Sequence, residues 1–93
     1  MSIARIPREE RDRLLAEKGL AAKRIVEDEI IQAWFSEERG RAAERMIAAP
    51  VSDDQSRRDA ALDIQALDRL WRHLETEAGQ GMAALKTIEK RKA

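Results

Sequence analysis

Few residues in this sequence have the types and spacing that catalysis or metal binding requires. The chain has one histidine, His73, and no cysteine, which excludes a thiol nucleophile and the usual histidine and cysteine ligand sets of transition metals. His73 stands four residues before Glu77, and on a helix this pair would supply only half of a metal site. We therefore expect His73 to be an exposed or half-buried helix residue rather than a ligand or a general base.

Carboxylates and hydroxyls are present, but their contexts predict solvated helix faces and helix caps. Paired acids catalyse proton transfer only where burial or a close neighbour separates their pKa values. The serines lack the G-x-S-x-G and S-x-x-K contexts, and the sequence contains no glycine-rich phosphate loop. We therefore expect no enzyme, no catalytic residue, no metal site and no cofactor. The residues considered are Glu27, Asp28, Glu29, Glu37, Glu38, Asp53, Asp54, Ser36, Ser52 and Ser56.

Charge is unevenly distributed although the net charge is zero. Residues 27–55 carry three basic and eight acidic groups, whereas residues 79–93 carry four basic and one acidic group. The basic ends could contact phosphates, and the acidic middle opposes a broad nucleic-acid footprint, so we favour plain solubility over nucleic-acid binding. The C-terminal candidates for phosphate contact are Lys86, Lys90, Arg91 and Lys92.

The stronger signal is the spacing of apolar residues. From Ala60 to Ala78 they recur at alternating steps of four and three, which places them on one stripe of a helix. A second set steps by four through Val26, Ile30 and Trp34, and Ile31 and Phe35 are spaced in the same way beside it. Such stripes pack helix against helix, and core packing is the main interpretation of the aromatic residues, with a partner hot spot as the alternative. The core or interface candidates are Ile30, Trp34, Phe35, Ile64, Leu67, Leu70, Trp71 and Leu74.

This pattern predicts an all-α protein with a single domain over residues 1–93. We expect an antiparallel helical hairpin of about residues 8–48 and 53–78, followed by a short C-terminal helix of about residues 82–90. Residues 1–6 and 90–93 are expected to be flexible. No apolar run reaches ten residues, so we expect no membrane span and no membrane partner.

Local signals set the expected helix boundaries. Pro7 suits a first helical turn, and Pro50 ends the first long helix. The periodicity resumes after Gly40, so we expect the helix to continue through it. Ser52 with Gln55 forms a capping-box pattern for the second helix, and Gly79 with Gly81 predicts its end.

Several short motifs suggest a family. Ala33-Trp34, Asp54 with Arg57-Arg58, the run Ala66-Leu67-Asp68-Arg69, Leu74-Glu75 and Gly81 together resemble small uncharacterised α-helical proteins encoded among the structural genes of tailed bacteriophages and prophages. The resemblance covers roughly residues 30–85; the segment from Phe35 to Val51 is longer than in that pattern, and Arg69 replaces a hydrophobic residue. It implies a virion or assembly protein that forms a homo-oligomer and contacts other phage structural proteins or a host protein, in the bacterial host cytoplasm or the virion.

Two alternatives remain open at the level of sequence. One is a small nucleic-acid-binding or packaging accessory protein that uses its basic termini, and the other is a host-directed phage inhibitor. The first predicts salt-dependent binding that is lost when residues 86–93 are removed.

Replacing Leu67 by Asp should unfold the protein, because the apolar stripe of the second helix would then bury a charge. The melting temperature measures this effect. A folded Leu67→Asp protein with an unchanged melting temperature would contradict the assignment of this stripe to the core.

Overall fold

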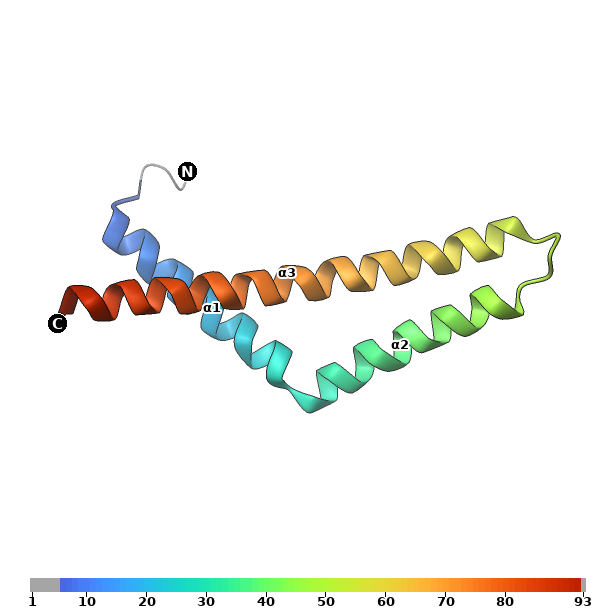
Figure 1. The fold of residues 1–93 in the computed structure, drawn as a ribbon, viewed down its shortest axis with the longest axis horizontal. Coiled ribbons are helices and arrows are strands. Elements are labelled where there is room, and N and C mark those ends of the chain that lie inside the picture. The colour runs from blue at the N-terminus through green and yellow to red at the C-terminus, as the bar shows by residue number, and fades with distance from the viewer. Residues whose placement is uncertain (1–5, 93) are drawn as a thin grey trace. The chain divides into compact units, whose positions relative to one another are not determined.

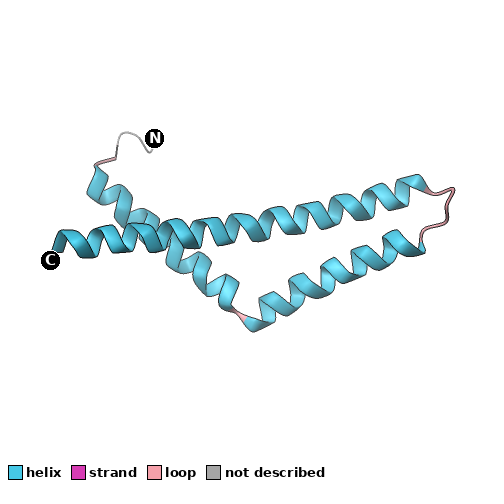
Figure 2. Cartoon of the chain, viewed as in Figure 1, coloured by secondary structure: helices cyan, strands magenta, loops and turns pink. Residues whose placement is uncertain are grey.

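The computed structural model describes residues 6–92, and the regular elements in that range are three α-helices (Figure 2). They are α1 (Arg8–Glu27), α2 (Glu29–Ala48) and α3 (Asp54–Lys92). The predicted all-α class is confirmed. The chain divides into two compact units, one containing residues 6–26 and 73–92 and the other Glu27–Arg72. Helix α3 contributes residues to both (Figure 1).

The predicted single helix over residues 8–48 is wrong, because the helix breaks at Asp28. Asp28 has an extended backbone conformation, and its carboxylate accepts hydrogen bonds from the backbone N–H groups of Ile30 (2.8 Å) and Ile31 (3.1 Å). Asp28 is therefore the N-cap of α2. Helix α2 does continue through Gly40, as predicted, and ends before Pro50.

The predicted short C-terminal helix is also wrong, because α3 runs unbroken for 39 residues, through Gly79 and Gly81. A glycine C-cap needs a left-handed backbone, and no glycine among residues 6–92 has a positive φ. Both α1 and α2 contact α3, α1 in the first unit and α2 in the second, so a simple hairpin with a short extra helix does not describe the fold.

Asp53, rather than Ser52, caps the start of α3. The Asp53 carboxylate accepts hydrogen bonds from the backbone N–H of Ser56 (3.0 Å) and from the Ser56 hydroxyl (2.7 Å). Gln55 donates instead to the carboxylate of Asp59 at 2.8 Å, so the predicted Ser52–Gln55 capping box does not form.

The prediction that the two ends of the chain are flexible concerns mainly residues that the structure does not describe. Residues 1–5 and 93 are not among the described residues, and residues 90–92 form the end of α3. Within the described range, no helix combines the length and the apolar character that crossing a membrane requires.

In the first unit, α1 and α3 meet at two glycines. A Cβ atom placed on Gly81 would overlap the Cα of Gly19 and lie 3.0 Å from the carbonyl oxygen of Leu15. The residues buried around this crossing are equally small: Ala16 and Ala22 on α1, and Ala84 on α3. The two backbones are therefore in direct contact, as small residues allow at helix crossings.

In the second unit, α2 and the first part of α3 run side by side and are joined by the turn at residues 49–53 (Figure 1). Ala42 and Ala60 are its buried residues. Two ion pairs link the helices at their edges, Arg39–Asp68 at 3.1 Å and Arg45–Asp63 at 2.8 Å. The Phe35 and Trp71 rings pack at a centroid distance of 4.9 Å.

Replacing Gly81 by Ala should destabilise the fold, because the added methyl group must push α1 and α3 apart. Overpacking of this kind costs about 1–3 kcal/mol. Gly40 is the matched control, since it is exposed within α2, a Cβ there meets nothing within 4 Å, and Ala stabilises an exposed helix position by about 1 kcal/mol. Chemical denaturation at fixed protein concentration should give opposite signs for Gly81→Ala and Gly40→Ala. Equal effects would contradict the close helix crossing.

Candidate functional site

Many of the large apolar side chains in the described range are exposed, and the others are half-buried. The buried residues are alanines and glycines, and no large apolar side chain in residues 6–92 is fully buried. By contrast, Ile30 is 80% exposed, Leu62 is 60% exposed and Trp34 is 50% exposed. Single exposed apolar residues are ordinary, but neighbouring ones mark candidate interaction surfaces. The other large apolar residues in this exposed class are Leu14, Leu20, Ile25, Ile47, Val51, Leu70 and Met82.

The predicted core or interface residues fall into two groups. Phe35, Leu67 and Trp71 are half-buried and line one groove of about 280 Å³ between α2 and α3. Ile64 and Leu74 are also half-buried, Leu74 within the first unit. Ile30, Trp34 and Leu70 are exposed, so Ile30 does not pack inside the helix pair as expected. The sequence could place these residues on apolar stripes but could not tell which side of α2 the partner helix covers.

Ile30 and Trp34 form one exposed surface on α2. Together with Glu29, Ala33 and Glu37 they line a shallow hollow of about 350 Å³, which we call the Trp34 patch. Ile30, Ala33, Trp34 and Glu37 lie three or four residues apart, so they share one face of the helix. The Trp34 ring meets Phe35 edge-on at a centroid distance of 5.2 Å, which holds the indole at the patch. A half-exposed tryptophan beside an exposed isoleucine is typical of a protein-binding hot spot.

Comparison with protein-family models, with curated proteins and with solved structures gives no match for this chain. The resemblance to phage structural proteins therefore stays a prediction.

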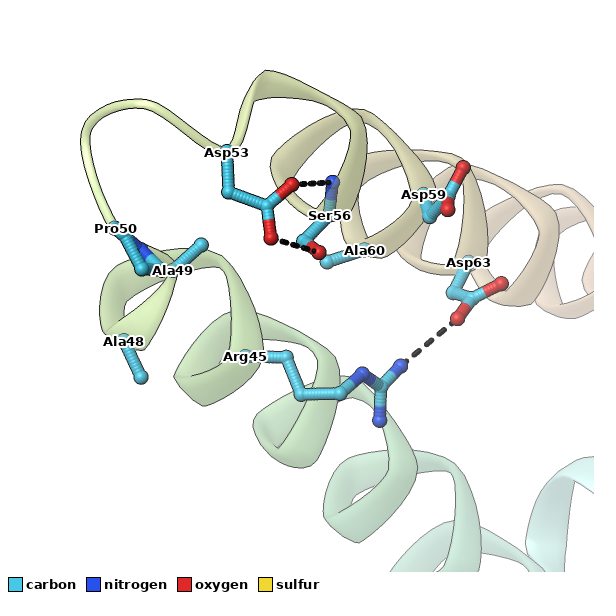
Figure 3. Close-up of a pocket in the computed structure, with 9 residues that line it drawn as sticks. All are labelled: Arg45, Ala48, Ala49, Pro50, Asp53, Ser56, Asp59, Ala60 and Asp63. Atoms are coloured by element: carbon cyan, nitrogen blue, oxygen red, sulfur yellow. Dashed lines mark hydrogen bonds and ion pairs between the residues drawn. The ribbon is translucent and has the colours of Figure 1, made fainter.

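A second hollow, of about 390 Å³, lies at the turn between α2 and α3 (Figure 3). Its wall combines Arg45 with the carboxylates of Asp53, Asp59 and Asp63, and Arg45 pairs with Asp63 across it. Hydrogen bonds from the hydroxyl and then the backbone N–H of Ser56 lower the pKa of Asp53 from its usual 3.8. These polar groups are engaged in holding the turn and the helix start. No set of three or more candidate metal ligands forms within residues 6–92.

Arg57 holds the same turn and was not singled out as a site residue by the sequence. Its guanidinium donates hydrogen bonds to the carbonyl oxygens of Pro50 and Val51, both at 2.6 Å, and it also pairs with Asp54. Both carbonyls lie in the turn between α2 and α3, so Arg57 ties the start of α3 to this turn. The sequence signal for this contact of Arg57 is its position, because it is an arginine near the start of a helix that follows a short turn.

The candidate phosphate contacts differ in their surroundings. Lys86, Lys90 and Lys92 are exposed, whereas Arg91 pairs with Asp12 of α1 at 2.5 Å. His73 has an exposed side chain and lies 3.8 Å from Glu77, which also faces Lys18 at 4.0 Å. The pair of His73 and Glu77 is therefore the surface helix pair that the sequence suggested.

Replacing Asp53 by Ala should lower the melting temperature at neutral pH by several degrees, and replacing Ser52 by Ala should change it far less. The reason is that Asp53 accepts both cap hydrogen bonds.

The same variant has a defined pH dependence. Because folding lowers the pKa of Asp53, its ionised carboxylate stabilises the fold above pH 3.8, and this contribution is lost as the pH falls through the folded-state value. The difference in melting temperature between wild type and Asp53→Ala should therefore shrink in strong acid. An equal or larger loss for Ser52→Ala would show that Ser52 is the cap.

Proposed function

We propose that this chain is a non-enzymatic protein that acts through helix-mediated self-association and protein–protein contacts, as a virion or assembly component of a phage-type particle. The observation that supports this most directly is where the apolar residues lie. Among residues 6–92 the buried positions hold alanines and glycines, while Ile30, Trp34, Leu62 and Leu70 remain half exposed or more. The phage context rests on the resemblance of residues 30–85.

The energetics favour association. Fully burying a Leu, Ile or Val side chain stabilises a fold by roughly 1.5–3 kcal/mol, and burying an alanine contributes much less. Chains of this length bury a smaller fraction of their unfolded surface than larger domains do, and oligomerisation is a common way for them to gain stability. Copies of this chain that cover the Trp34 patch and Leu62 would recover burial energy that a monomer leaves unused.

The basic end of α3 supports a second candidate, a nucleic-acid-binding accessory protein. Lys86, Lys90 and Lys92 are exposed in its last turns. The acidic stretch at residues 27–55 weighs against a broad phosphate footprint, and Arg91 is already paired with Asp12. A host-directed inhibitor would use the same apolar surfaces as an assembly protein.

Light scattering at two protein concentrations should give a solution mass above the chain mass of 10.6 kDa, with a larger value at the higher concentration or a constant multiple of the chain mass. The physical reason is burial of the exposed apolar residues between copies. A well-folded monomer at both concentrations would contradict self-association and would make binding to nucleic acid or to a host protein the better candidates.

A further inference from the structure

The Trp34 patch has an acidic rim. Glu29 and Glu37 stand on either side of Ile30 and Trp34 along α2 and line the same hollow. Glu37 lies 3.8 Å from Arg41, but both side chains are more than half exposed, and such surface pairs contribute little free energy. The patch therefore offers two apolar side chains and two carboxylates to a partner.

A second exposed stripe lies on α3, in the other unit. It consists of five exposed residues that share one helix face, because the last four follow the first by three, four, seven and eleven positions. These residues are Gly79, Met82, Ala83, Lys86 and Lys90. We call this face the lysine stripe. Gly79 has open space where a side chain would be, so no contact among residues 6–92 explains a residue that costs about 1 kcal/mol in a helix.

The two surfaces are complementary in shape and in charge. The patch presents a bulky indole and an isoleucine, and the stripe presents two small residues beside a flexible methionine, whose sulfur packs well against aromatic rings. The patch has carboxylates at its rim, and the stripe ends in Lys86 and Lys90. The surrounding segments repeat this contrast, since residues 27–55 are strongly acidic and residues 79–93 are basic.

We infer that the Trp34 patch of one copy docks onto the lysine stripe of a second copy of this chain. This inference rests on the proposed self-association and specifies the surfaces that carry it. Gly79 and Ala83 allow the indole of Trp34 to approach the backbone of α3, and Lys86 and Lys90 approach the acidic rim. The exposed glycine in the middle of a long helix then has a function.

The contact joins two different surfaces, so each copy keeps one of each free. Repetition of such a head-to-tail contact produces a closed ring or an open filament, whereas a contact between identical surfaces stops at a dimer. Copies of the chain joined in this way form a repeating arrangement of the kind that a layer of a particle needs.

The test uses two variants that each remove one surface. In the patch variant, Ile30→Lys and Glu37→Gln replace an apolar side chain that is 80% exposed and one rim carboxylate. In the stripe variant, Gly79→Gln and Ala83→Gln fill the small-residue surface without a clash, because nothing lies within 4 Å of a Cβ on Gly79. Ile47→Lys is the matched control, since Ile47 is an isoleucine of α2 that is 85% exposed and belongs to neither surface. Circular dichroism checks that every variant keeps its helices.

Each variant alone should associate at least about tenfold more weakly than wild type, as expected when a central interface residue is lost, while Ile47→Lys should keep the wild-type mass. An equimolar mixture of the two variants should form a complex of two chains and nothing larger. The patch variant supplies an intact stripe, and the stripe variant supplies an intact patch.

Three outcomes would overturn the inference. If wild type associates and both variants keep its mass, these surfaces are not the interface, although the proposed self-association stands. If the variants are monomeric and their mixture is too, the contact is not head-to-tail. A wild-type chain that stays monomeric at every concentration removes both the inference and the proposed function.

Discussion

The close approach of α1 and α3 at Gly19 and Gly81 constrains what the first unit can bury. Each glycine occupies the space that a Cβ of the other would need, so the helix backbones touch and only alanines fit around them. Contacts of this kind are tight but cover little apolar area, because each small side chain contributes little burial. In the second unit Ala42 and Ala60 are the buried residues, and the rings of Phe35 and Trp71 add a larger apolar contact between the helices.

Helices whose buried residues are small leave part of the surface of their larger side chains exposed. Ile30, Trp34 and Leu62 keep half or more of their surface exposed, although the sequence contains enough apolar residues for ordinary helix packing. Polar contacts such as Arg45–Asp63 lie at the exposed edges and contribute to the geometry more than to the stability of the fold. Under the proposed function, stability and function depend on the same step, the covering of these side chains by another chain.

The sequence predicted what depends on local pattern. The helical class, the helix through Gly40 and the end of α2 before Pro50 all follow from periodicity and backbone restrictions. The break at Asp28 could not be read from the pattern, because apolar residues continue on both sides of it and only the side-chain hydrogen bonds reveal the cap. The sequence predicted that Gly81 ends a helix. Its close contact with Gly19 could not be predicted, because Gly19 is distant in the sequence. The apolar stripe that includes Trp34 was visible in the sequence, but its exposure depends on which side of α2 faces α3.

The central claim is that the fold completes its apolar burial between copies. Its most direct test is the melting temperature measured across about a hundredfold range of protein concentration, because association stabilises the folded state by mass action. The account predicts that the melting temperature rises steadily with concentration. A melting temperature that stays constant across the whole range, for a chain whose mass is that of a monomer, would contradict it.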